Sequence, residues 1–152
     1  MSEHSFGVRL RAAMDVHGPL CVGIDPHQAL LHAWGLGTDL ASVERFSMTA
    51  VEAFAGFLVR WPAHPHADNA MYWRAECFLR SGDAPRGVRE LQGLLERFPV
   101  GNKVPDALFT LRTALLRAGD AAGAERAGQR LLNDHADSEA ARRLRDEREG
   151  GR

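Results

Sequence analysis

The stretch AMYWRAECFLRSGD at residues 70–83 recurs as ALFTLRTALLRAGD at residues 107–120, an offset of 37 residues. The two copies share their first alanine and their closing Gly-Asp pair, and the same offset carries Leu94 to Leu131. A fixed period of this size is typical of stacked supersecondary units that bury a continuous core between neighbours. Three segment ends also follow one another at this spacing: Trp61-Pro62, Phe98-Pro99 and His135-Ala136.

Each repeated unit is predicted to form two helices joined by a short turn. A first helix over 68–80 ends at Gly82, which supplies a left-handed cap, and Asp83 caps the helix that follows. Apolar residues three and four apart indicate a second amphipathic helix over 85–97, which Pro99 ends. Three further helices are predicted by the same signals: 105–118, 121–135 and one that begins after Ser138.

Pairs of helices at this period, with small residues where the two helices cross, resemble the tetratricopeptide family. Ala75 and Gly87 occupy these small positions in the first unit. In the second unit Arg112 takes the place of Ala75. We therefore expect the Arg112 side chain to extend toward solvent or to loosen the packing of its helix pair.

The repeat region also carries a more specific pattern. Residues 62–73 read PAHPHADNAMYW, and residues 101–108 read GNKVPDAL. These runs, together with three residues beyond the usual period of about 34, resemble the C-terminal repeat module of the periplasmic cell-division coordinators of the Tol-Pal system. The resemblance covers about residues 53–145. It implies a superhelical scaffold that binds protein segments and performs no chemistry.

The N-terminal part does not repeat the 37-residue period. An amphipathic helix is predicted over 6–17, and the apolar run LCVGI at 20–24, with a proline on either side, is typical of a buried strand. Further helices are predicted over 26–34 and over about 42–61. The chain is thus expected to be mostly all-α, with tetratricopeptide-like repeats preceded by a helix–short strand–helix segment.

The stretch GPLCVGIDPH at residues 18–27, with ERFSMTAVEAFAGF at residues 44–57, resembles the N-terminus of the longer bacterial orotidine 5'-phosphate decarboxylases. The resemblance covers about residues 6–57 and implies a segment that contains the first strand of a (β/α)8 barrel. In that family the aspartate corresponding to Asp25 faces the substrate ribose. Asp25 is therefore a vestigial substrate contact or, as the alternative, a helix N-cap.

Two features separate this chain from a working decarboxylase. The resemblance implies a site with two lysines and two aspartates, in which a cation replaces the departing CO2. Lys103 is the only lysine of the chain, and its 152 residues are fewer than the roughly 200 that such a barrel needs. No catalytic residue and no cofactor are therefore expected. The chain is interpreted as a fusion of residues 1–57 and residues 58–152, joined through a shared helix over about 42–61.

Composition and charge narrow the classes of function. The formal net charge is -1, which lacks the basic surplus of a nucleic-acid-binding protein. No apolar run reaches the ~20 residues of a membrane span, and the N-terminus lacks the basic and apolar regions of a signal peptide. A cytoplasmic location or a recombinant origin is therefore expected, whereas the repeat relatives are periplasmic. His64 and His66 have no third ligand nearby, and no metal site is predicted.

The repeat register places one candidate binding site. The first helix of each unit lines the concave face of such a stack. Residues on that face are expected to form a groove for peptide or protein segments: Asn69, Tyr72, Glu76, Asp106, Phe109 and Thr113.

The unpaired strand at 20–24 and the small number of repeats predict self-association as a homo-oligomer, through exchanged segments as one route. Three functions remain open for this sequence. The first is a chimeric scaffold with no evolved function, and the second is a peptide-binding adaptor of the cell-envelope type. The third is a vestigial decarboxylase fragment.

Overall fold

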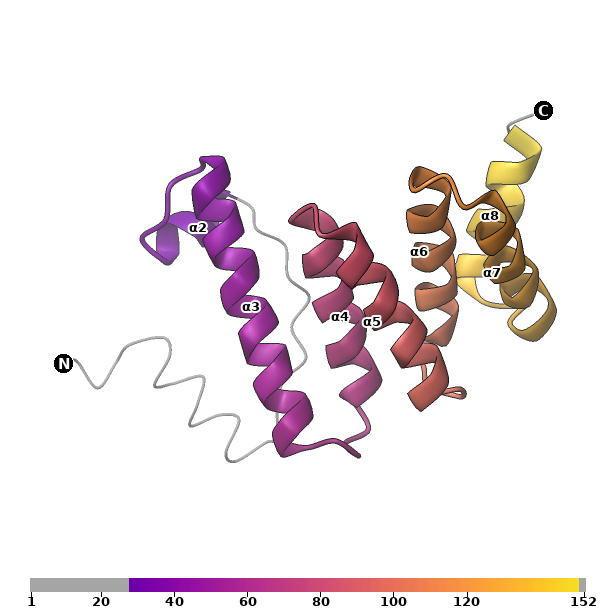
Figure 1. Cartoon of the computed structure of the whole chain (residues 1–152), viewed down its shortest axis with the longest axis horizontal. Coiled ribbons are helices and arrows are strands. Elements are labelled where there is room, and N and C mark those ends of the chain that lie inside the picture. The colour runs from indigo at the N-terminus through magenta and orange to yellow at the C-terminus, as the bar shows by residue number, and fades with distance from the viewer. Residues whose placement is uncertain (1–27, 151–152) are drawn as a thin grey trace.

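A computed structural model describes residues 28–150 of the chain. Within this range the protein is all-α and contains no strand, which confirms the expected fold class. Figure 1 shows α3 to α8 arranged side by side in chain order. The seven helices are α2 (Gln28–Ala33), α3 (Leu40–Arg60), α4 (Ala67–Arg80), α5 (Ala84–Arg97), α6 (Val104–Arg117), α7 (Ala121–Asp134) and α8 (Glu139–Gly150).

The 37-residue period of the sequence is also a period of the structure. Helices α4 and α6 each span 14 residues and begin 37 positions apart, and the same holds for α5 and α7. Helix α4 packs on α5 and α6 packs on α7 as antiparallel pairs, while α3 and α8 cover the two ends of this array. The predicted helix bounds agree with the observed ones to within one or two residues.

A glycine and an aspartate form the turn inside each pair. Gly82 has a φ of 89° and Gly119 a φ of 83°, in the left-handed region that residues with a side chain rarely adopt. Asp83 and Asp120 then accept a hydrogen bond from the backbone N–H three residues later, at 3.2 and 2.8 Å. The Gly-Asp pair that closes both copies of the repeat therefore encodes this turn.

Helix α3 also begins where a local signal places it. The backbone N–H of Ser42 donates to the side chain of Asp39 at 2.8 Å, which caps α3 and lowers the pKa of the Asp39 carboxyl. Helix α3 then runs for 21 residues from Leu40 to Arg60, close to the helix expected over about 42–61. The predicted helix over 6–17, the strand over 20–24 and Asp25 lie outside the described residues.

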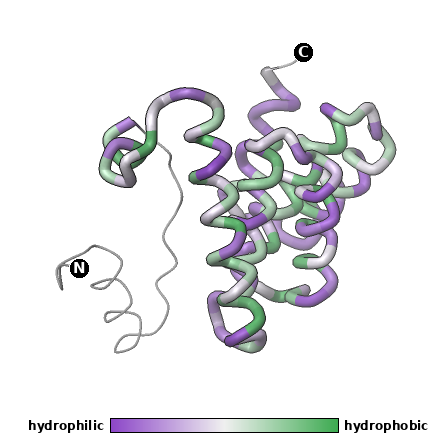
Figure 2. Tube along the Cα trace, turned by 60° about the vertical axis from the view of Figure 1, so that its left-hand side comes forward, coloured by the Kyte–Doolittle hydropathy of each residue, from purple (hydrophilic) through white to green (hydrophobic). Residues whose placement is uncertain are grey.

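The apolar core runs through the whole stack. One cluster of buried side chains extends from Leu58 of α3 to Leu144 of α8. The last turns of α8, toward the C-terminus, are instead mostly hydrophilic (Figure 2). The largest fully buried side chains are Leu91, Leu94, Val104, Leu108, Leu131 and Leu144.

In the first helix pair the small residue of the contact between the helices lies on the first helix and the large one on the second, and in the second pair the order is reversed. Ala75 and Leu91 are fully buried in the first pair, and Arg112 and Gly128 stand 37 residues further along. A Cβ at Gly128 would lie 3.1 Å from Cδ of Arg112, so the aliphatic stem of Arg112 occupies the space beside this glycine. Its guanidinium pairs with Glu147 of α8 at 3.0 Å, and only 16% of the side chain is exposed. Arg112 therefore does not extend into solvent as expected, because α8 covers its guanidinium and its stem fills the space beside Gly128.

A glycine-to-alanine substitution tests the close crossing of α4 and α5. A Cβ at Gly87 would lie 2.5 Å from Cγ of Leu79 and 3.2 Å from the carbonyl oxygen of Ala75. Gly87→Ala is therefore expected to lower the free energy of unfolding by about 1–3 kcal/mol. No atom lies within 4 Å of a Cβ at Gly56 in α3, so Gly56→Ala should stabilise by about 0.5–1 kcal/mol. Chemical denaturation measures the free energy of unfolding of both variants. If the two substitutions change it in the same direction, α4 and α5 do not cross as closely as described.

Candidate functional site

A groove of about 490 Å³ lies where α4, α6 and α8 meet. These are the first helices of successive units, on which the concave face was expected. The groove contains five of the six residues predicted for this face: Tyr72, Glu76, Asp106, Phe109 and Thr113. The structure thus brings five predicted residues from two helices together on one surface.

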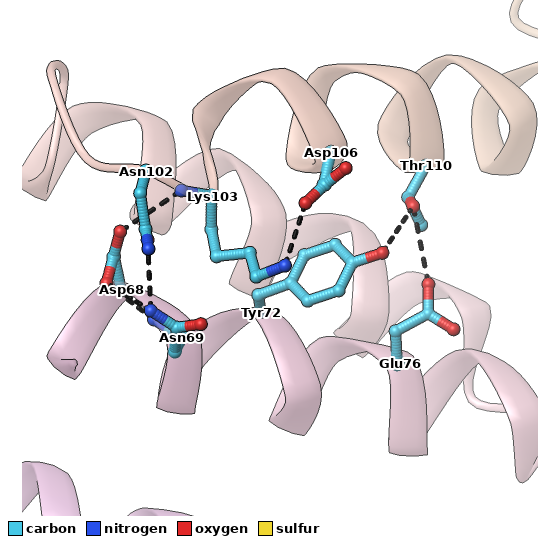
Figure 3. A network of polar contacts seen from close by, with 8 residues as sticks. All are labelled: Asp68, Asn69, Tyr72, Glu76, Asn102, Lys103, Asp106 and Thr110. Carbon is cyan, nitrogen blue, oxygen red and sulfur yellow. Dashed lines mark hydrogen bonds and ion pairs between the residues drawn. The ribbon is translucent and has the colours of Figure 1, made fainter. Parts of the chain in front are cut away.

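Hydroxyl groups and two aromatic rings form much of the groove wall. The Tyr72 hydroxyl lies 3.3 Å from the Thr110 hydroxyl, which in turn donates to Glu76 at 3.3 Å (Figure 3). Phe109 is mostly buried and presents its ring beneath the guanidinium of Arg143, whose Cζ lies 4.6 Å from the ring centroid. The wall therefore offers apolar surface beside polar groups that can donate or accept hydrogen bonds.

Burial raises the pKa of Tyr72 to about 12, and the nearby carboxylates of Glu76 and Asp106 act in the same direction. Tyr72 is the only tyrosine of the chain, so the absorbance of tyrosinate reports this group alone. We expect a midpoint near pH 12 in the folded protein, and near 10 in denaturant. The pKa of Tyr72 is higher in the folded than in the unfolded protein. The free energy of unfolding is therefore independent of Tyr72 ionisation below about pH 10, and it falls as the pH rises from about 10 toward 12. A midpoint near 10 without denaturant would show that the ring is not buried in this way.

Asn69 belongs to a structural network rather than to the groove. Its side-chain amide donates to Asp68 at 3.1 Å and to Asn102 at 2.9 Å (Figure 3). The carboxylate of Asp68 also accepts from the backbone N–H of Lys103 at 3.2 Å, and Asp68 is only 3% exposed. These contacts hold the linker between α5 and α6 against the start of α4. Asn69 does not line the groove, so the prediction that grouped it with the other five residues is not supported by its position.

The only lysine is engaged at the edge of the same groove. Lys103 Nζ lies 2.8 Å from the carboxylate of Asp106 and 5.2 Å from the centroid of the Tyr72 ring. A second aromatic ring, Trp73, lies 5.8 Å from the same nitrogen. The ammonium therefore joins the linker to both helices of the inner face through a salt bridge and cation–π contacts.

Sequence reasoning missed four polar or charged residues of the groove: Arg80, Thr110, Arg117 and Arg143. A signal for two of them was present, because Arg80 and Arg117 end equivalent helices at the 37-residue offset. Arg143 reaches the groove only because α8 packs on α6. That contact does not follow from the pattern of one helix.

The other candidates do not form a site in the part of the chain that the structure describes. His64 and His66 share a turn, in which the backbone N–H of His66 donates to Nδ1 of His64 at 3.1 Å. Across residues 28–150 no group of three or more histidine, cysteine, aspartate or glutamate side chains is arranged to hold a metal ion. Among the described helices none is long and apolar enough to cross a membrane.

Part of the chain is similar to known enzymes. Over 50 residues it is 68% identical to the orotidine 5'-phosphate decarboxylase of Streptomyces coelicolor, a match that covers 33% of this chain and 18% of that enzyme. Over 53 residues it is 57% identical to the decarboxylase of Nocardioides sp., which covers 35% of this chain and 19% of that enzyme. No family model matches the chain. The chain thus shares about a third of its length with orotidine 5'-phosphate decarboxylases, and spans less than a fifth of the length of these relatives.

Proposed function

We propose that this protein is a non-enzymatic protein-binding module whose groove between α4, α6 and α8 holds an extended peptide segment. The observation that carries the proposal is the convergence of aromatic, hydroxyl and charged side chains on one groove of about 490 Å³. Binding sites of this kind combine apolar contact area with a few oriented polar groups. The groove belongs to the concave side of a helical-repeat stack, which is the surface that such scaffolds use for extended ligands.

We also propose that the N-terminal segment and the helical stack of this chain come from two different protein families. A decarboxylase-like N-terminal segment is joined to a tetratricopeptide-like stack, and the resemblance of residues 53–145 to the envelope cell-division coordinators suggests a segment of an envelope protein as the partner. The match of about 50 residues to the decarboxylases agrees with the length of the stretch 6–57 that carries that resemblance. Decarboxylation is disfavoured, because the chain has only Lys103 and this lysine is bound to Asp106. An assay that detected decarboxylation of orotidine 5'-phosphate would overturn this part.

A matched pair of threonine variants tests the groove. Thr113 lines the groove and Thr49 is exposed on α3, and each hydroxyl donates to the backbone carbonyl four residues earlier. Thr113→Trp should fill the groove and reduce peptide binding about tenfold or more, whereas Thr49→Trp should leave it unchanged. Wild type and both variants would be compared on an array of random-sequence peptides.

Two outcomes decide between a binding module and a scaffold without a ligand. Peptides that bind wild type and Thr49→Trp but not Thr113→Trp would support the binding function. If no peptide distinguishes wild type from Thr113→Trp, the groove is not a binding site and the chimeric scaffold is the better description.

Self-association is a second part of the proposal. Large apolar side chains are exposed on α3 and just before it, with Trp34 43%, Met48 39% and Val59 83% exposed. Contacts between copies would cover part of this surface. Size-exclusion chromatography with light scattering is expected to show a dimer or larger species, and a monomer at tens of micromolar would contradict it.

A further inference from the structure

We propose that the segment bound in the groove is acidic, and that Arg117 and Arg143 hold its carboxylates. This inference rests on the proposed peptide-binding function and adds the chemistry of the ligand. It comes from the charges along the groove, which do not balance within the part of the protein that the structure describes.

The acidic side chains of the groove already have partners. Glu76 pairs with Arg80 at 3.3 Å, and Asp106 pairs with Lys103 at 2.8 Å. A ligand cation would have to displace one of these partners to reach a carboxylate. The groove is therefore poorly suited to a basic segment.

Two arginines of the groove are left without such a partner. Arg117 at the end of α6 and Arg143 in α8 both line the groove, and both are exposed. Across residues 28–150 neither has a carboxylate within 4.0 Å, although seven other basic side chains do. The groove thus has a local surplus of positive charge in a protein whose net charge is -1.

Arg143 is also held in a suitable position. Its guanidinium lies over the ring of Phe109, with Cζ 4.6 Å from the ring centroid. A guanidinium stacked in this way keeps its N–H groups available for a bidentate contact with a carboxylate. The stacking also reduces the side-chain entropy that binding would otherwise cost.

The spacing of the two arginines indicates the spacing of the acidic residues. The ring below Arg143 belongs to Phe109, eight positions before Arg117 on α6. At ~1.5 Å per residue this is about 12 Å along the helix. An extended peptide covers that distance in about three to four residues. The rings of Tyr72 and Phe109 offer an apolar surface for a hydrophobic side chain of the same segment.

Fluorescence anisotropy with a labelled peptide tests this inference. The probe is a short peptide in which two glutamates flank a leucine at this spacing, and its partner peptides carry glutamine or lysine instead of glutamate. Wild type should bind the glutamate peptide about tenfold more tightly than the glutamine peptide, and added salt should weaken the binding. Arg117→Ala and Arg143→Ala should each weaken the binding of the glutamate peptide about tenfold.

Two further variants separate charge recognition from loss of structure. Arg89→Ala removes an exposed arginine of α5 that does not line the groove, and its binding should equal that of wild type. In the described residues the Arg117 side chain has no salt bridge or hydrogen bond to lose, so Arg117→Glu should lower the melting temperature by only a few degrees, through the unfavourable negative charge in the last turn of α6. This variant should reverse the preference, so that the lysine peptide binds more tightly than the glutamate peptide.

The outcomes distinguish the ligand chemistry from the binding function. If glutamate and glutamine peptides bind equally, and Thr113→Trp abolishes both, the groove binds peptides but the acidic preference is wrong. If Arg117→Ala and Arg143→Ala both bind like wild type, the assignment of the two arginines is also wrong. Tighter binding of a single-stranded RNA than of the glutamate peptide, lost in the same variants, would likewise overturn it. If Thr113→Trp has no effect on any peptide, the proposed function itself fails.

Discussion

Leu108→Ala is expected to lower the free energy of unfolding by about 2–5 kcal/mol, because it removes most of a side chain from a fully packed environment. Leu108 lies in α6, is 1% exposed and belongs to the cluster that runs from α3 to α8. Domains of this size are stable by only about 5–15 kcal/mol. The loss is therefore a large part of the total and should lower both the urea midpoint and the melting temperature.

Leu116→Ala is the matched control for this result. It removes the same atoms from the same helix, so the change in helix propensity is nearly the same, but Leu116 is 47% exposed. We expect a change below about 1 kcal/mol. Urea denaturation followed by circular dichroism measures both variants. Equal losses for Leu108→Ala and Leu116→Ala would show that α6 does not pack with this face toward the core.

Asp68→Ala is expected to destabilise the protein by about 3 kcal/mol, because it leaves buried donors without an acceptor. The carboxylate accepts from the backbone N–H of Asn69 at 2.7 Å, from its side-chain amide at 3.1 Å and from the backbone N–H of Lys103 at 3.2 Å. Only 3% of Asp68 is exposed, so water cannot replace these contacts without local opening. The linker between α5 and α6 should then lose its attachment to α4.

Asp106→Ala is the control for Asp68→Ala. Both carboxylates lie in the first turn of a helix, at which negative charge is favourable, so this electrostatic contribution is lost in both variants. The Asp106 side chain is 41% exposed and makes a single salt bridge, which is worth about 0–1 kcal/mol at a surface. Hydrogen exchange provides a local measurement, because the amide of Lys103 should lose protection in Asp68→Ala only. Unchanged protection of that amide would show that Asp68 does not hold the linker.

The helix bounds could be predicted because the signals that set them are local. The cap at Gly82 needs a positive φ, and the cap at Asp83 needs an acceptor three residues before a free backbone N–H. Both requirements involve residues that are close in sequence. The same is true of Asp39, whose contact with Ser42 begins α3.

The groove could be predicted only in part. The repeat register placed Tyr72 and Phe109 on the inner face, because equivalent helices expose equivalent sides. Asn69 has the same register as Asp106, yet its side-chain amide donates to Asn102 of the linker and to the neighbouring Asp68. The contact with Asn102 joins residues 33 positions apart, so no local pattern contains it.

By itself the sequence determined the all-α repeat, its 37-residue period and the turns, since propensity, caps and apolar spacing act over a few residues. The tertiary structure alone decided how Arg112 is accommodated, because the answer depends on Gly128 in the facing helix and on Glu147 in α8. The salt bridges that neutralise Glu76 and Asp106 are local, because their partners lie only four and three residues away. The tertiary structure decided instead that Arg143 joins the groove, because α8 packs on α6.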